Sequence, residues 1–307
     1  MNFTTPRSVV EHWQNKTGNS AEELEIWINY CKDNLGFGGL SIAEESVLIG
    51  VDDLTNQINK LLSTTESAVL EFIKAKVSGD LDEMKKNLEI SAELSRSKKT
   101  RDLVLEGRIR MELGLIQFQE GDIESARDSV TWAETRLKSV ARYTLQHDIS
   151  LLNKAAFHYA IGEDLMALNF YSEISLEKEH ANETKGISRV SAGSILRDRG
   201  HTAAAARHYW NAFHYFSKTP LHEMRLEAGM LFLQLGGTHF DPGSKNMTEQ
   251  IVDAKPMAAG DEIPQARING DDLNTVINAC AALIEENNIQ GNLANNFSQL
   301  REIVMGA

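Results

Sequence analysis

The chain carries the segments GDLDEM (residues 79–84), GDIESA (121–126), GEDLMA (162–167) and GHTAAA (200–205). Their glycines follow one another after 42, 41 and 38 residues, so the same short segment recurs at a nearly constant interval. Recurrence at a fixed interval is typical of proteins built from stacked structural repeats. The four segments therefore predict four tight bends, each joining two consecutive elements of a repeat.

Small residues occupy matching positions around these bends. An alanine follows the turn glycine by five residues, an apolar or aromatic residue comes four positions later, and another small residue precedes the glycine by seven positions. In the last three copies these residues are Ala126, Val130 and Gly114, then Ala167, Tyr171 and Ala155, then Ala205, Tyr209 and Gly193. A small side chain lets two helices approach closely, and a larger one fills the space one turn further on. We therefore expect tight packing within each pair.

The chain between the bends has the composition of consecutive helices. Residues 7–219 contain no proline, although an average usage of about 5% would place roughly ten there. Proline interrupts helices, and the apolar residues recur at separations of three and four, so helices are favoured over strands. Capping residues at Thr5, Ser20, Ser63 and Asp80 predict helices that begin directly after them. The predicted fold class is all-α.

The repeated pattern resembles the tetratricopeptide repeat (TPR), a helical hairpin with Leu-Gly in its first helix, a Gly-Asp turn, and alanine with an aromatic residue in its second helix. Leu113, Gly114, Gly121, Asp122 and Ala126 match these positions. The interval of 38 to 42 residues is longer than the family's usual length of about 34 and is similar to the elongated repeats of kinesin light chains. The resemblance implies a right-handed superhelical solenoid of helical hairpins, with extra helices at both ends.

The repeat pattern fades on both sides, which divides the chain into four predicted segments. Residues 1–63 hold amphipathic stretches that we expect to form an N-terminal helical cap, because the end of a solenoid otherwise exposes apolar surface. TPR-like helical repeats are predicted over 64–236. An irregular loop is predicted over 237–270, where glycine and proline collect, and a C-terminal helical pair over 271–307.

Charge and cysteine content limit the classes of binding partner and the cellular compartment that we expect for this protein. With 31 Lys and Arg against 44 Asp and Glu, the net charge is -13, which disfavours binding to nucleic acid. No segment reaches the roughly 18 apolar residues of a membrane span, and the first residues do not have the pattern of a secretory signal. Cys31 and Cys280 form no disulfide scaffold or metal spacing. We expect a cytoplasmic protein that binds neither nucleic acid nor membrane.

Motifs that carry catalytic chemistry are missing from the sequence. There is no GxxxxGK[ST] phosphate loop, no GxSxG elbow and no HExxH zinc motif, so we expect no enzyme activity, no cofactor and no metal. One local reversal of the acidic balance is the basic cluster Arg96, Lys98, Lys99, Arg101, Arg108 and Arg110. Its simpler interpretation is cations at a helix end and on a solvated helix face, and the alternative is a site for an acidic peptide or a phosphate.

The TPR resemblance also implies a binding surface. In that family the first helix of each hairpin lines a concave groove that usually holds an extended or helical peptide. The positions it assigns here are Arg108, Met111, Leu115, Gln119, Leu152, Asn153, Ala156, Tyr159, Val190, Ser194 and Arg197. They are mostly apolar with a few hydrogen-bond donors, which suits a peptide groove, although an apolar stripe at helical spacing is also typical of a core.

The predicted function is a non-enzymatic adaptor that binds a peptide or protein segment in this groove. The alternative is a structural or self-associating subunit of a larger assembly, a homo-oligomer for example. In that alternative the groove is filled by the chain's own C-terminal helices or by a neighbouring copy.

Overall fold

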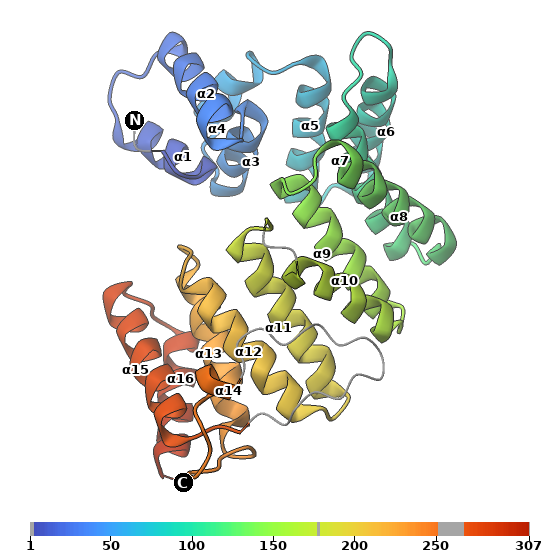
Figure 1. The fold of residues 1–307 in the computed structure, drawn as a ribbon. Helices are drawn as coiled ribbons and strands as arrows, with labels where there is room; N and C mark the ends of the chain where they lie inside the picture. Colours follow the sequence, from blue (N-terminus) through green and yellow to red (C-terminus); the bar gives the residue numbers. More distant parts are fainter. Residues whose placement is uncertain (1–2, 177–178, 251–266, 307) are drawn as a thin grey trace. The chain divides into compact units, whose positions relative to one another are not determined.

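The computed structural model describes residues 3–176, 179–250 and 267–306, which form the α-helices α1 to α16 (Figure 1). Within this described part the only pairing of β type is an isolated bridge between Phe240 and Ile268. The predicted all-α fold class is confirmed. Contacts along the chain divide it into two compact units, residues 1–146 and 147–307, and the division falls inside the predicted repeat segment 64–236.

The first unit contains eight consecutive helices and the start of a ninth. They are α1 (Pro6–Asn15), α2 (Ala21–Leu35), α3 (Gly39–Ile49), α4 (Asp52–Asn59), α5 (Thr64–Ser78), α6 (Leu81–Arg96), α7 (Leu103–Gln119) and α8 (Ile123–Val140). The predicted starts of α1, α2, α5 and α6 are confirmed, because each capping side chain accepts a hydrogen bond from a backbone N–H in the first turn.

The second unit continues with the same kind of helices. They are α9 (Leu145–Ala160), α10 (Asp164–Leu176), α11 (Asn182–Asp198), α12 (Thr202–Phe216), α13 (His222–Gly236), α14 (Met247–Gln250), α15 (Gly270–Glu286) and α16 (Asn292–Gly306). α15 begins one residue before the segment 271–307 that was predicted as a C-terminal helical pair, and α16 lies within it. The predicted loop 237–270 lies partly outside the described residues, and its described part includes α14.

The four predicted bends are present. Gly79, Gly121, Gly162 and Gly200 have φ angles of +76°, +84°, +82° and +81°. This left-handed conformation is strained for residues that carry a β-carbon, which explains why glycine recurs at these positions. Each bend ends one helix and reverses the chain into its partner, so α5 and α6, α7 and α8, α9 and α10, and α11 and α12 are consecutive hairpins.

The helices of a hairpin approach closely at the small residues, as predicted. A β-carbon at Gly114 of α7 would lie 2.8 Å from Val130 Cγ2 of α8. The same relationship recurs in the second unit, between Gly193 of α11 and Tyr209 of α12. Ala126, Ala167 and Ala205 are fully buried. Backbone-to-side-chain contact of this kind leaves no room for a larger residue, so it sets the spacing of the paired helices.

After α13 the hairpin pattern changes. The helix that packs on Gly229 and Gly236 of α13 is α15, whose Cys280 and Leu273 occupy the space beside these two glycines. α15 and α16 thus complete the core of the second unit, and Cys280 is fully buried there. In the first unit, α1 to α4 build a core with Trp13, Trp27 and Cys31, which α5 to α7 extend. Both cysteines are free thiols.

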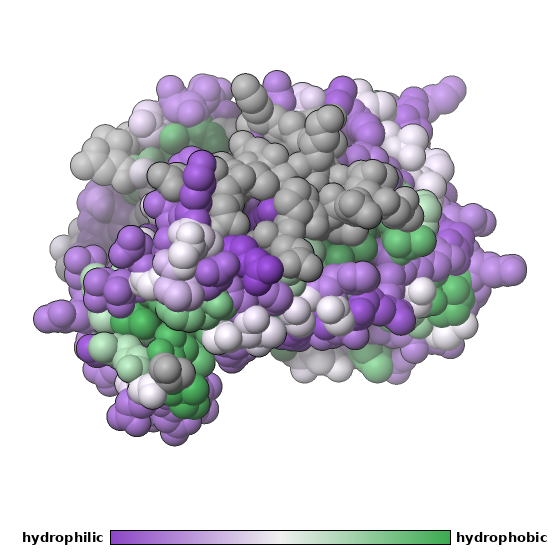
Figure 2. Space-filling view, turned by 60° about the horizontal axis from the view of Figure 1, so that its bottom comes forward, coloured by the Kyte–Doolittle hydropathy of each residue, from purple (hydrophilic) through white to green (hydrophobic). Residues whose placement is uncertain are grey.

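Across the described part of the chain, no helix is both long and apolar enough to cross a bilayer. On the face drawn in Figure 2, hydrophilic side chains cover most of the visible surface and hydrophobic ones gather in separate patches.

Candidate functional site

Four of the predicted groove residues lie on α7 in the first unit, and they differ in accessibility. Arg108 forms an ion pair with Glu44 of α3, and both side chains are largely covered. Met111 is buried, with 3% of its surface exposed. Leu115 is half-buried and Gln119 is exposed. The guanidinium of Arg108 is therefore engaged within the first unit.

The other seven predicted residues lie on α9 and α11 in the second unit, and we call them the α9–α11 surface. They are Leu152, Asn153, Ala156 and Tyr159 on α9, and Val190, Ser194 and Arg197 on α11. None of these seven is buried. Their neighbours on the same helices, such as Leu151, Ala155 and Ile195, are buried in a common cluster. The predicted residues thus form the accessible face of two helices that share a core.

A polar network joins the two helices at one end of this surface. The Tyr159 hydroxyl of α9 donates a hydrogen bond of 3.2 Å to Asp198 Oδ2 of α11. Arg197 Nε and Nη2 donate to Asp198 Oδ1 over 3.1 and 3.0 Å. The bond to Asp198 raises the pKa of Arg197, so the guanidinium stays charged. The Ser194 and Tyr209 hydroxyl oxygens lie 3.2 Å apart. Tyr159 and Arg197 are therefore held in fixed positions.

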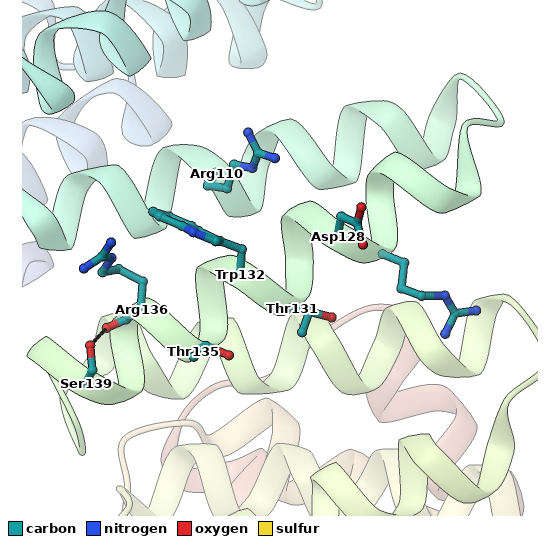
Figure 3. A pocket seen from close by; sticks show the side chains of 8 residues that line it. Arg110, Asp128, Thr131, Trp132, Thr135, Arg136 and Ser139 are labelled. Carbon is teal, nitrogen blue, oxygen red and sulfur yellow. Dashed lines mark hydrogen bonds between the residues drawn. The ribbon is translucent and has the colours of Figure 1, made fainter.

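A second accessible site lies in the first unit, and we call it the Arg110–Trp132 groove. It is an open groove of about 780 Å³ on α7 and α8 (Figure 3). One lining residue, Arg110, comes from α7, and the others come from α8: Arg127, Asp128, Thr131, Trp132, Thr135, Arg136 and Ser139. Guanidinium groups and hydroxyls predominate among the polar side chains, with one carboxylate.

Trp132 is the centre of this groove. It is 37% exposed, whereas Trp13, Trp27 and Trp210 are buried. The guanidinium carbon of Arg136 lies 4.9 Å from the centre of the indole, a cation–π contact, and Figure 3 shows Arg110 at the other side of the ring. Within the described part of the chain, neither Arg110 nor Arg136 forms an ion pair, and the buried Nε of Arg110 has no hydrogen-bond partner.

A smaller pocket of about 250 Å³ adjoins the groove. The two cavities share Arg110 and Trp132. The remaining lining comes from Ala92, Ser95 and Arg96 of α6 and from Glu106, Ile109 and Leu113 of α7. The walls contributed by alanine, isoleucine, leucine and tryptophan are apolar. A charged groove and an apolar pocket therefore meet at the same two side chains.

The helical periodicity of α7 and α8 explains the position of the groove. α8 faces the core through Ala126, Val130, Ala133 and Leu137, which are at most 1% exposed. Trp132 and Arg136 fall outside this stripe and reach solvent. Successive residues of an α-helix are turned by about 100°, so Arg110 lies about 160° around α7 from Arg108 and about 100° from Met111. The groove therefore lies away from the residues that the TPR resemblance assigned to α7.

The sequence interpretation missed most of this groove. Arg96 and Arg110 belong to the predicted basic cluster, for which a phosphate or acidic-peptide site was the alternative. Lys98, Lys99 and Arg101 of the same cluster are exposed between α6 and α7 and line neither cavity. The overlooked signal is Trp132, a large aromatic residue that stands outside the apolar stripe of its helix.

A third group of side chains, His147, Asp148 and His180, is buried in the second unit. Their potential ligand atoms lie within 4.8 Å of one another, close enough to hold a metal ion. Asp148 accepts hydrogen bonds from His180 Nδ1 over 2.6 Å, from the Thr184 hydroxyl over 2.7 Å and from the Ala181 backbone over 3.4 Å. The carboxylate therefore anchors the start of α11, a structural role that accounts for its burial.

Opposing effects act on the pKa of Asp148. Burial favours the neutral acid and by itself would raise the pKa, but the hydrogen bonds from His180 and Thr184 stabilise the carboxylate. The net effect lowers the pKa below its ordinary value. Asp148 therefore stays ionised in the folded second unit.

Comparison with known proteins adds little to this geometry. No protein-family model matches the sequence, and a search of curated proteins gives no match. Among solved structures, the chain is similar to BtubC (BKLC) from P. vanneervenii, with 12% sequence identity and a TM-score of 0.34. That similarity covers 93% of this chain and 89% of the other. A likeness of this extent does not bear on function.

Proposed function

We propose that this protein is a non-enzymatic adaptor of the TPR type, in which the α9–α11 surface binds a segment of another protein. The accessibility of all seven predicted residues on α9 and α11 carries this proposal. Leu152 and Val190 also pack against the adjoining cores, and five of the seven side chains are half-buried, but none of the seven loses its solvent-accessible surface altogether. We place the adaptor in the cytoplasm, in keeping with its two free cysteines.

The chemistry of the surface suits a peptide. The remaining accessible parts of Leu152 and Val190, which are half-buried against the core, offer apolar contacts. Asn153, Ser194 and Arg197 offer donors for backbone carbonyls or a carboxylate. Tyr159 and Arg197 are already held through Asp198, so little side-chain freedom is lost when a ligand binds. Affinity would come from apolar burial, and specificity from the fixed donors.

The proposal is tested by a substitution that blocks the α9–α11 surface but keeps the other side chains that would contact the peptide. Ala156 is exposed at the middle of the row on α9, so Ala156→Glu adds bulk and charge to the surface itself. Leu165→Glu on α10 is the matched control, because Leu165 is exposed in the same unit and is outside the row. Peptides selected from a random display library on the unaltered chain should bind Ala156→Glu at least about tenfold more weakly, and Leu165→Glu unchanged.

Two results would contradict the proposal. Selected peptides that bind Ala156→Glu as tightly as the unaltered chain would place the binding site elsewhere. An oligomer of the unaltered chain that Ala156→Glu dissociates, measured by analytical ultracentrifugation, would favour the self-associating alternative. Thermal unfolding of both variants, followed by circular dichroism, checks that the helices are intact.

A further inference from the structure

We propose that the Arg110–Trp132 groove binds a phosphorylated segment of a partner protein. This site lies in the first unit and uses none of the residues of the α9–α11 surface, so it does not depend on the function proposed above. The phosphate would lie in the groove between Arg110 and Arg136, and an apolar side chain of the same segment would enter the adjoining pocket.

The cations of the groove favour a phosphate. In the described part of the chain, Arg110 and Arg136 make no ion pair, and the Arg110 Nε is buried without an acceptor. A guanidinium presents parallel N–H donors that match two phosphate oxygens, and clusters of arginine are a recurring way of recognising phosphorylated residues. The chain as a whole has a net charge of -13, so the arginines of this groove form a locally positive surface that favours an anion.

Hydroxyl groups extend the set of donors. Thr131 and Thr135 are both exposed, lie one turn apart on α8 and line the same groove as the two arginines. Their hydroxyls can donate to the phosphate oxygens that the guanidinium groups leave open. Two carboxylates, Asp128 in the groove and Glu106 in the adjoining pocket, oppose the positive charge. The two cavities together are lined by four arginines, which outnumber these two carboxylates: Arg96, Arg110, Arg127 and Arg136.

Trp132 restrains one of the arginines. The cation–π contact with Arg136, at 4.9 Å, holds the guanidinium over the indole before any ligand binds. Restraint of this kind lowers the conformational entropy lost on binding. The contact also covers one face of the indole, which leaves less of the ring for stacking with a nucleobase.

The adjoining pocket identifies the ligand as a protein segment. Its apolar walls come from Ala92, Ile109, Leu113 and Trp132, and its volume of about 250 Å³ accommodates an aliphatic side chain. Inorganic phosphate has no group that could fill it. A polynucleotide carries many phosphates and would meet the overall negative charge of the chain. A phosphorylated residue with an aliphatic neighbour matches both cavities.

The test uses the full chain and a peptide library with one fixed phosphoserine and randomised flanking positions. A matched library carries serine at the fixed position. We expect the chain to retain the phosphoserine library, with aliphatic residues enriched at one flanking position. A fluorescein-labelled peptide made from the enriched sequence should bind about tenfold or more tightly than its serine counterpart. Replacing its enriched aliphatic residue with serine should also weaken binding, with the phosphate kept.

Protein variants locate the binding. The double variant Arg110→Glu/Arg136→Glu should lose at least about tenfold in affinity for the phosphopeptide. Arg101→Glu is the matched control, because this exposed residue of the same basic cluster lines neither cavity. Ala156→Glu in the other unit should leave phosphopeptide binding unchanged, which separates this site from the α9–α11 surface.

Several results would overturn the proposal. One is equal retention of the serine and phosphoserine libraries, and another is an equal loss of affinity in Arg101→Glu and in the double variant. Competition by inorganic phosphate at the concentration where the phosphopeptide competes would indicate a general anion site. A single-stranded oligonucleotide that binds more tightly than the phosphopeptide would make the groove a nucleic-acid site.

Discussion

Tyr209 of α12 packs against the backbone of Gly193 of α11, so that a β-carbon at residue 193 would lie 2.7 Å from the Tyr209 Cε1 atom. The tyrosine ring is fully buried. Neither residue can enlarge without separating the two helices, because the interior is already densely packed.

Gly193→Ala should therefore lower the free energy of unfolding by about 2 kcal/mol. Gly237→Ala is the control, because Gly237 has a helical φ of -62° and no atom near its β-carbon position. It should be neutral or slightly stabilising. Urea denaturation of both variants measures the difference, and a Gly193→Ala protein as stable as the Gly237→Ala protein would refute the close contact.

At Gly121 the requirement for glycine comes from the backbone conformation and not from close packing. Its φ of +84° is left-handed, and no atom lies near a β-carbon placed there, so only backbone strain opposes a substitution. Gly121→Ala should cost about 1 kcal/mol, and Gly121→Asn should cost less, since asparagine tolerates the left-handed region better than alanine does. Equal stability of the glycine, asparagine and alanine proteins would show that the bend is not left-handed in solution.

The surroundings of Trp132 predict a charge-selective fluorescence response. Because the other three tryptophans are buried, an aqueous quencher acts mainly on Trp132, and Arg110 and Arg136 concentrate anions near it. At constant ionic strength, the ratio of iodide to caesium quenching should be higher than for a free, uncharged tryptophan derivative. Arg110→Glu/Arg136→Glu should lower this ratio, and Trp132→Phe should remove most of the quenching. A ratio no higher than that of the free derivative would contradict the positive potential of the groove.

The Asp148 anchor predicts acid sensitivity of the second unit. The pKa of Asp148 is lower in the folded state than in the unfolded state, where an aspartate has a pKa of about 3.9. Asp148 therefore contributes stability above roughly pH 4, and this contribution is lost as the pH falls through its lower folded pKa.

Asp148→Ala should lower the free energy of unfolding by about 3 kcal/mol at neutral pH, since it leaves buried partners without their acceptor. The difference from the unaltered chain should shrink below roughly pH 4. Asp164→Ala, which removes an ion pair with the solvent-exposed Arg199, should have a much smaller effect. Denaturation at a series of pH values measures both, and a difference that grows on acidification would contradict the lowered pKa.

The sequence allowed the helical hairpins to be predicted because their determinants are local. A left-handed bend requires glycine at one position, and a close helix contact requires a small residue at another, so Gly121 and Gly193 reveal both features without knowledge of the rest of the chain. Capping hydroxyls such as Ser63 act within one turn and mark the helix starts in the same way.

The candidate sites depend on contacts between residues far apart in sequence, which periodicity does not reveal. Met111 and Leu115 belong to the same predicted stripe, yet only Met111 is buried. Arg108 is engaged by Glu44, a residue 64 positions earlier. Trp132 lines a cavity because α6, α7 and α8 pack together there. Sequence patterns indicated which residues share a helix face, and tertiary packing decided which of those faces reach solvent.

The two buried cysteines report on local unfolding of the two units. Only the thiolate reacts with alkylating reagents, and burial raises the pKa of Cys31 and brings that of Cys280 to about 12. Each unit holds one of these thiols in its core. The rate of alkylation at Cys31 therefore measures how often the core of the first unit opens to solvent. The rate at Cys280 measures the same for the second unit. Peptide mass spectrometry of a single sample measures alkylation at both cysteines and so distinguishes local unfolding of the first unit from that of the second.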